Sequence, residues 1–231
     1  MTVIHSIFAA LRLRAPLGLA LIVAAAVLAP ACSSDDRDTA PFATPSPTPA
    51  GYLGRVLDEP MPKPDFTLTD TSGNPYNFKQ ETEGYLTYLY FGYTYCPDIC
   101  PSHMADIAAV IKRQPEFKEK VKVVFVTVDP DRDTPERLRL WLDLFDKSFV
   151  GLRGDAAQLE DATKQALGNL WFPVEKQYPA DGGENYLMSH AAFVQLYTLD
   201  NVTHIVYPFG VPQSGYEWDL IKLIKEGWIE S

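Results

Sequence analysis

Two cysteines, Cys96 and Cys100, stand four positions apart in the stretch YCPDICP, and each is followed directly by a proline. Thiols at this spacing can do two kinds of chemistry. They can cycle between dithiol and disulfide, or they can hold a soft metal ion as thiolates. A structural disulfide is a weak explanation, because closing so small a loop removes little chain entropy from the unfolded state.

The number of residues between the cysteines favours a metal site. Disulfide reductases of the C-x-x-C type have two intervening residues, whereas this motif has three, which allows the sulfurs to part around an ion. Structural zinc normally takes four protein ligands, and the sequence has no second cysteine pair to supply them. Two thiolates and one imidazole would suit three-coordinate Cu(I). A thiol–disulfide reductase that uses Cys96 and Cys100 stays open as the alternative.

The segments on either side of the motif predict how the thiols are positioned. Residues 84–93 are continuously aromatic and aliphatic, which is typical of a strand covered on both faces, and residues 101–114 predict a helix. Pro101 suits the first position of this helix, so we expect Cys100 at or near the N-cap. A helix N-terminus stabilises a thiolate and lowers the pKa of a thiol there.

The rest of the chain from residue 65 onward alternates between predicted strands and helices. Ser214 and Glu217 form a capping-box pattern before the last helix, and Gly227 is expected to end it. The pattern predicts an α/β fold, a thioredoxin-like sandwich whose central mixed sheet is flanked by helices and includes a late β-hairpin. The predicted strands are 65–70, 121–129 and 149–154, the helices are 133–147, 155–168 and 216–226, the hairpin is 191–209, and 169–188 is irregular.

Four histidines are candidates for a third metal ligand. His5 lies in the N-terminal segment, and His204 lies in an alternating stretch that predicts an ordinary strand. His103 follows Cys100 by three residues, but it is expected to project from the first turn of the helix, away from the preceding loop. His190 opens a predicted strand at the point where thioredoxin-like folds present a loop beside their thiols. We favour His190, with His103 as a competitor.

The N-terminal part of the chain predicts targeting rather than folding. Residues 1–31 combine two arginines, an apolar stretch and an Ala-Pro-Ala cleavage pattern, as a secretory signal peptide does. Cys32 follows at once and predicts a lipid anchor, with a single N-terminal transmembrane anchor as the alternative. The Pro-, Ser- and Thr-rich composition of residues 32–51 predicts a flexible tether. Residues 52–231 are then expected to form one domain.

Charge and predicted location restrict the partners. Removal of the signal peptide leaves 18 basic and 30 acidic residues, a formal charge of −12. Such a chain lacks the basic surface that phosphate binding needs, so we expect no nucleic-acid partner. The anchor predicts a place at the extracytoplasmic face of the cell membrane, where stable disulfides are permitted.

Three blocks of the sequence resemble one known family. FGYTYCPDICP, VDPDRDTPERL and YLMSHAAFVQLYTLD, in this order and separation, look like the Sco (SenC/PrrC) family, over about residues 64–228. The resemblance implies a thioredoxin-like domain on a membrane tether that binds one copper ion, as Cu(I) or Cu(II). The ligands that it implies are Cys96, Cys100 and His190, and His103 falls outside this set.

The same resemblance implies a function and partners. It implies a copper chaperone, not an enzyme, that assists assembly of the binuclear copper site of cytochrome c oxidase. The expected partners are the copper-site-bearing subunit of the oxidase and other periplasmic copper carriers or thiol reductants. The main rival is a reductase that keeps the cysteines of that subunit reduced, and a redox or copper sensor is a third alternative.

Other residues in these blocks have a structural interpretation beside a functional one. DPDRDTPE lacks the glycine and the final glutamate of a calcium loop, so it predicts a strand-to-helix turn with a cap. The resemblance adds that this turn lies near the metal site, so that Asp129 or Asp133 could support a ligand or face a partner; the structural interpretation is preferred. Met104 and Met188 could offer thioether sulfur to copper, although methionines so placed usually pack in the core. Asp98 is expected to place a favourable charge at the helix start.

Overall fold

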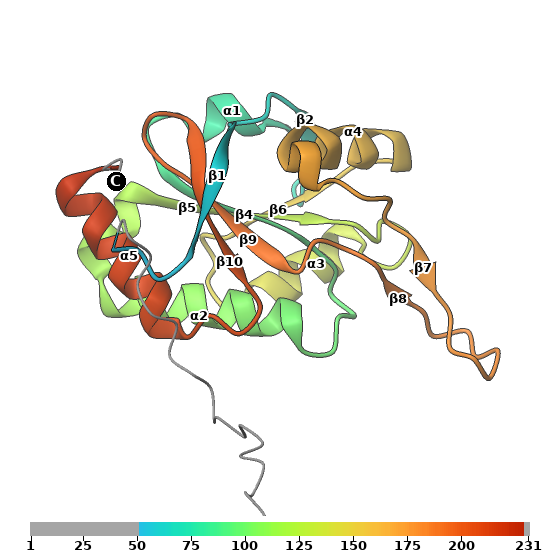
Figure 1. Cartoon of the computed structure of the whole chain (residues 1–231). Coiled ribbons are helices and arrows are strands. Elements are labelled where there is room, and N and C mark those ends of the chain that lie inside the picture. Colours follow the sequence, from blue (N-terminus) through green and yellow to red (C-terminus); the bar gives the residue numbers. More distant parts are fainter. Residues whose placement is uncertain (1–50, 229–231) are drawn as a thin grey trace, which may run out of the picture. The chain divides into compact units, whose positions relative to one another are not determined.

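The computed structural model of the chain describes residues 51–228 (Figure 1). The predicted signal peptide, Cys32 and nearly all of the predicted tether lie outside the described residues. None of the helices between residues 51 and 228 combines the length and the apolar character that a bilayer crossing requires.

A mixed sheet of eight strands forms the centre of the described domain, in the order β1-β10-β9-β4-β5-β6-β2-β3. Strands β4, β5 and β6 run parallel to one another, and the other pairs are antiparallel. The predicted α/β sandwich with a late hairpin is confirmed. The strands are Arg55–Pro62 (β1), Thr67–Asp70 (β2), Pro75–Asn77 (β3), Leu86–Gly92 (β4), Val121–Thr127 (β5), Val150–Arg153 (β6), Phe193–Tyr197 (β9) and Val202–Pro208 (β10).

Helices cover both faces of this sheet. Figure 1 shows α2, α3 and α5 on one face and α1 and α4 on the other. The crossovers β4-α2-β5 and β5-α3-β6 advance in the same direction across the sheet, and right-handed crossovers then place α2 and α3 on the same face. The helices are Phe78–Glu81 (α1), Ile99–Arg113 (α2), Pro135–Leu142 (α3), Ala156–Leu167 (α4) and Gln213–Glu226 (α5), with 3-10 turns at Pro115–Lys120 and Gly168–Leu170.

The core is densest around β4 and β5. All seven residues of β4 are buried, because helices cover both faces of a central parallel strand. Phe125 of β5 packs against Trp141 of α3 with ring centroids 5.1 Å apart, and Tyr207 of β10 stacks on Tyr216 of α5 at 4.2 Å. Burial of such a side chain contributes about 1.5–3 kcal/mol. The carboxyl ends of β4 and β5 therefore leave a well-packed core.

The helix after β4 begins earlier than predicted. α2 starts at Ile99, and its N-cap is Asp98, whose carboxylate accepts a hydrogen bond from the Ile99 N–H at 2.6 Å. Aspartate is among the preferred N-cap residues, and proline is tolerated anywhere in the first helical turn. The prediction that Cys100 lies at or near the N-cap is confirmed, because Cys100 is the second residue of the helix after the Asp98 cap. The expected position of the Asp98 side chain at the helix start is confirmed.

The capping box predicted before the last helix is wrong. α5 begins at Gln213, and its N-cap Pro212 offers no side-chain cap. Glu217 instead accepts hydrogen bonds from Arg113 at 2.9 Å and from Gln114 at 3.1 Å. These contacts with α2 occupy the carboxylate that the local pattern assigned to the cap. Gly227 ends the helix as predicted, with φ of 72°.

A short ribbon interrupts the region predicted to be irregular. Lys176–Gln177 (β7) and Leu187–Met188 (β8) pair antiparallel. Figure 1 shows this β7–β8 ribbon projecting from one end of the sheet. His190 lies between β8 and β9. The ribbon is thus the last element before the predicted histidine ligand.

Candidate metal centre

Both cysteines lie at the carboxyl end of β4, where the chain passes into α2. The Cys96 N–H donates to the Tyr93 carbonyl at 3.2 Å, which closes a tight turn after the strand. Cys100 follows in the first turn of α2. The carboxyl ends of strands in an open α/β sheet are the usual place for binding sites.

Folding brings the ligand atoms of Cys96, Cys100 and His190 together. All three atoms lie within 4.8 Å of one another, and Cys100 Sγ lies 3.7 Å from His190 Nε2. Cys100 is fully buried, Cys96 is 8% exposed and His190 is half-buried. The two thiols are free. Within residues 51–228, this is the one group of three or more His, Cys, Asp or Glu residues that could hold a metal ion.

The two thiols have opposite electrostatic surroundings. The hydrogen bond from the Cys100 thiol lowers the pKa of Cys96 to about 4 against the effect of burial, with help from His190 and from the backbone N–H groups of Cys100 and Asp98. The Cys100 N–H lies 3.3 Å from Cys96 Sγ. Burial raises the pKa of the Cys100 thiol, and its hydrogen bond to the Cys96 thiolate raises it further. The surroundings therefore favour the thiolate form at Cys96 and the protonated thiol at Cys100.

Two tyrosines that sequence analysis missed surround the histidine and the buried sulfur. Tyr90 OH donates to Cys100 Sγ at 3.5 Å. The rings of Tyr90 and Tyr93 pack edge-on against His190, with centroids 5.9 and 5.5 Å away. The period of two along β4 was an available signal for Tyr90 alone, because it puts this residue on the same face as Gly92, against which Cys100 packs.

The imidazole is oriented by its own backbone. His190 Nδ1 lies 3.1 Å from the carbonyl oxygen of Ala191. A carbonyl accepts a hydrogen bond, so this contact favours the tautomer with its proton on Nδ1, in which the lone pair of Nε2 is free for a metal ion. The nitrogen that faces Cys100 is therefore the one able to bind a metal ion.

Gly92 at the end of β4 makes room for the buried sulfur. A Cβ atom at this position would lie 3.0 Å from Cys100 Sγ and 2.8 Å from the Tyr90 ring. Both separations are shorter than ordinary van der Waals contact. Cys100 can therefore lie against the strand because residue 92 has no side chain.

The other candidate ligands lie elsewhere. His103 Nδ1 is 2.7 Å from Tyr216 OH, the residue is 3% exposed, and burial lowers its pKa to about 4. Met104 is fully buried in the hydrophobic core. Met188 is buried and lines a separate cavity. The structure does not bring His103 into the group of Cys96, Cys100 and His190.

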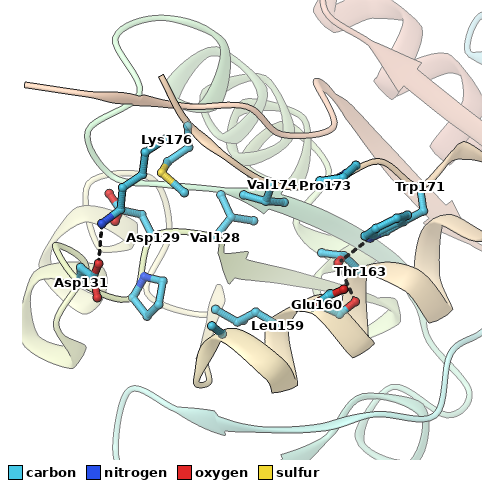
Figure 2. A pocket seen from close by; sticks show the side chains of 13 residues that line it. Val128, Asp129, Asp131, Leu159, Glu160, Thr163, Trp171, Pro173, Val174 and Lys176 are labelled. Atoms are coloured by element: carbon cyan, nitrogen blue, oxygen red, sulfur yellow. Dashed lines mark hydrogen bonds and ion pairs between the residues drawn. The ribbon is translucent and has the colours of Figure 1, made fainter. Parts of the chain in front are cut away.

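The cavity beside Met188 has a different chemistry (Figure 2). It has a volume of ≈ 380 Å³ and is lined mainly by apolar side chains from the end of β5, from α4 and from residues 171–176. Figure 2 shows the ion pair of Lys176 with Asp131, at 2.7 Å, at one end, and the hydrogen bond from Trp171 to Thr163, at 3.2 Å, at the other. Its lining has no pair of thiols.

The turn after β5 is connected to the segment that carries the cysteines. Asp133 is fully buried and accepts hydrogen bonds from the Thr94 N–H at 3.0 Å, the Thr94 hydroxyl at 2.6 Å and the Thr127 hydroxyl at 2.6 Å. Burial raises the pKa of Asp133. Thr134 caps α3 by accepting from the Arg137 N–H at 3.2 Å. The predicted strand-to-helix turn with a cap is confirmed.

The donor atoms of Cys96, Cys100 and His190 suit a soft ion of low coordination number. Metal–thiolate bonds of about 2.3 Å allow two sulfurs on opposite sides of an ion to lie up to about 4.6 Å apart. The observed limit of 4.8 Å for the three ligand atoms is close to this separation. Thiolates select Cu(I) or zinc, and structural zinc would normally need a fourth ligand.

Comparison with known protein families agrees with these observations. The family model described as SCO1/SenC matches residues 57–224. An SCO2-like protein of Rickettsia conorii is 33% identical over 155 residues, which cover 66% of this chain and 72% of that relative.

Solved structures show the same fold. The solution structure of apo Sco1 from Thermus thermophilus is 30% identical with a TM-score of 0.63, and the match covers 74% of this chain and 96% of that chain. The structure of Bradyrhizobium japonicum ScoI with copper bound is 28% identical with a TM-score of 0.59, over 70% of this chain and 98% of that chain. The thioredoxin-like fold predicted from the sequence is confirmed.

Proposed function

Because this chain belongs to the SCO1/SenC family, we propose that it is a copper-delivery protein that binds one Cu(I) ion through Cys96, Cys100 and His190. The observation that carries the proposal is the convergence of two thiol sulfurs and one imidazole nitrogen within 4.8 Å. The copper bound to a similar ScoI supports the choice of metal. The family resemblance supports the binuclear copper site of cytochrome c oxidase as the destination.

The proposed location follows the predicted division of the chain. Residues 1–31 would direct export, Cys32 would carry a lipid, and residues 32–51 would tether the domain at the extracytoplasmic face of the membrane. The short apolar stretch and the cysteine directly after it support this division. Metabolic labelling with a radioactive fatty acid tests it, because label in the wild type and none in Cys32→Ala is expected for a lipid anchor and not for an uncleaved helix.

The unequal burial of the three ligands suggests an order of copper transfer. His190 is half-buried and Cys96 is slightly exposed, whereas Cys100 is fully buried. A thiolate of the partner would approach from the side of His190 and Cys96. A three-coordinate ion has room for this fourth ligand, so a new copper–sulfur bond can form before an old bond breaks. Cys100 would then release the ion last.

A thiol–disulfide reductase is the second candidate, and the two free cysteines favour it. The Cys96 thiolate would attack one sulfur of a partner disulfide, and the other partner sulfur would leave as a thiolate. Cys100 would then lose its proton and attack Cys96, which forms the Cys96–Cys100 disulfide and releases the second partner thiolate. This reaction requires no histidine.

Anaerobic titration of the purified protein with Cu(I) separates the two functions. Copper delivery predicts one tightly bound ion in the wild type, none in the double Cys96→Ser, Cys100→Ser variant, and weaker binding in His190→Ala. The reductase function is favoured over copper delivery if His190→Ala binds copper as tightly as the wild type and only the double cysteine variant loses disulfide reduction.

A further inference from the structure

We propose that Arg132 is a positioning residue for the copper site. It connects the β7–β8 ribbon to the cysteine loop, residues 93–98, and so holds His190 within reach of both sulfurs. Arg132 is not itself a ligand, and it acts through the two segments that carry the ligands. The proposal deepens the proposed function and rests on it.

Arg132 binds the ribbon through Tyr186, the residue directly before β8. The guanidinium carbon lies 3.6 Å from the centre of the Tyr186 ring. Its Nη1 donates a hydrogen bond to the Tyr186 carbonyl at 2.9 Å. Because Tyr186 precedes His190 by four residues, these contacts fix the chain close to the imidazole.

The same guanidinium contacts the cysteine loop. Its carbon lies 4.6 Å from the centre of the Tyr95 ring and 5.8 Å from that of the Tyr93 ring. Cations within about 6 Å of a ring centroid are attracted to the ring face. Tyr95 directly precedes Cys96, and the Tyr93 ring packs against His190 at 5.5 Å. One side chain therefore contacts both segments that carry ligands.

Asp129 fixes the orientation of Arg132. Its buried carboxylate forms an ion pair with Arg132 Nε at 2.5 Å, and its other oxygen accepts a hydrogen bond from Tyr186 OH at 2.9 Å. Asp129, Arg132 and Tyr186 thus form a closed triangle in which each residue contacts the other two. Taking charges out of water costs free energy, and such pairs can specify one arrangement of a structure instead of adding stability. This triangle would specify where the ribbon lies.

Two neighbouring cations, Arg137 and Lys176, each contact only one of the two segments, either the cysteine loop or the β7–β8 ribbon. Arg137 packs on the Tyr95 ring at 3.8 Å and donates to Thr94 Oγ1 at 2.7 Å, both in the cysteine loop. Lys176 packs on the Tyr186 ring at 4.7 Å and belongs to the ribbon itself. In residues 51–228, Arg132 is therefore the cation that contacts both, and Arg137 is a matched control.

A double-mutant cycle with His190 tests the proposal. The Cu(I) affinity of the full-length protein is measured by competition with a chromophoric chelator for the wild type, Arg132→Met, His190→Ala and the double variant. Methionine keeps an unbranched side chain but removes the charge and the planar group. We expect Arg132→Met to weaken Cu(I) binding about 10–100-fold while His190 is present and to have no effect once residue 190 is alanine. An equal loss in both backgrounds would overturn the proposal, because Arg132 would then act on the fold in general.

A measurement without metal follows the ribbon directly. In the apo protein, amide hydrogen exchange of residues 186–191 is expected to be about tenfold faster or more in Arg132→Met than in the wild type, because local opening requires less free energy. The exchange is expected to be unchanged in Arg137→Met. Unchanged exchange in Arg132→Met would overturn the proposal.

Arg132→Lys keeps the test open if the methionine variant fails to fold. Lysine keeps a positive charge beside Asp129 but cannot reproduce the planar stacking on Tyr186. We expect a partial loss of Cu(I) affinity that disappears in the His190→Ala background, and full wild-type affinity would overturn the proposal. Failure of the proposed function has a different signature, because the wild type would then bind Cu(I) no more tightly than His190→Ala does.

Discussion

Cys100 Sγ lies 3.7 Å from His190 Nε2, although 90 positions separate the two residues in the chain. The sheet explains this proximity. β9 is the antiparallel neighbour of β4, with Leu89 opposite Gln195 and Thr87 opposite Tyr197. The chain that enters β9 must therefore pass the carboxyl end of β4, where the cysteines lie. The pairing of the two strands sets the position of the imidazole relative to the thiols.

Cys96 is expected to react with alkylating reagents before Cys100. Cys96 is 8% exposed with a lowered thiol pKa, whereas Cys100 is fully buried with a raised pKa. In metal-free protein at pH 7, iodoacetamide is expected to modify Cys100→Ser at the initial wild-type rate and Cys96→Ser at least about tenfold more slowly. Peptide mass spectrometry measures both rates, and equal rates in the two variants would contradict the assignment.

Gly92→Ala is expected to displace the buried sulfur. The added Cβ would lie 3.0 Å from Cys100 Sγ and 2.8 Å from the Tyr90 ring, and overpacking of this kind costs about 1–3 kcal/mol of unfolding free energy. Urea denaturation of the reduced protein measures the loss. The Cβ would also lie 3.0 Å from the Phe125 ring. Cys100→Ala removes one of these three clashes, so the cost of Gly92→Ala should be smaller in that background. The same cost in both backgrounds would count against a clash with the sulfur.

Asp133→Ala is expected to loosen the attachment of the cysteine loop to β5. It leaves the buried Thr94 N–H and the hydroxyls of Thr94 and Thr127 without their acceptor. Leaving such donors unpaired costs about 2–4 kcal/mol in total. Asp131→Ala is the control, because its side chain is 67% exposed and its surface ion pair contributes about 0–1 kcal/mol. Thermal unfolding measures the loss of stability in each variant. An equally small loss in Asp133→Ala and Asp131→Ala would contradict this role of Asp133.

Lys63 is expected to make the stability of the fold depend on pH. The residue is 4% exposed, its Nζ donates to the Thr82 carbonyl at 3.0 Å, and burial lowers its pKa from 10.5 to about 8. Between these values the unfolded chain binds more protons than the folded chain, so stability rises as the pH rises through this window. Relative to Lys63→Met, the unfolding free energy of the wild type should increase by about 1–3 kcal/mol between pH 7 and pH 10.5. A difference in unfolding free energy that stays constant or falls over this range would contradict the prediction.

The elements that the sequence predicts are those with a strong local signal. β4 and β5 are runs of seven residues with almost complete burial, and α3 begins at Pro135, directly after the predicted strand-to-helix turn. β1 was missed, because Arg55–Pro62 contains two prolines and its register shifts between Val56 and Met61. β7 and β8 were missed as well, because two residues each are too few to show a period.

For the site, the cysteine spacing predicts a pair of thiols that can hold a metal ion. The sequence predicts few of the side chains that surround this pair. The residues alone favoured His190 and left His103 as a competitor, and the family resemblance placed His103 outside the ligand set. The structure leaves His103 outside the ligand group, and its Nδ1 instead lies 2.7 Å from the hydroxyl of Tyr216, which is 113 positions away. Arg132 could not be predicted, because its partner Tyr186 lies 54 positions further along the chain. Contacts of this kind depend on the packing of the sheet and its loops, for which no short pattern is a signal.

Copper K-edge X-ray absorption of the Cu(I)-loaded protein tests most directly whether one ion is bound by the sulfurs of Cys96 and Cys100 and by the nitrogen of His190. We expect scattering from two sulfurs and one nitrogen in the wild type. In His190→Ala the nitrogen contribution should disappear while both sulfurs remain. A spectrum that His190→Ala leaves unchanged, or one with fewer than two sulfur ligands in the wild type, would contradict the three-ligand copper site.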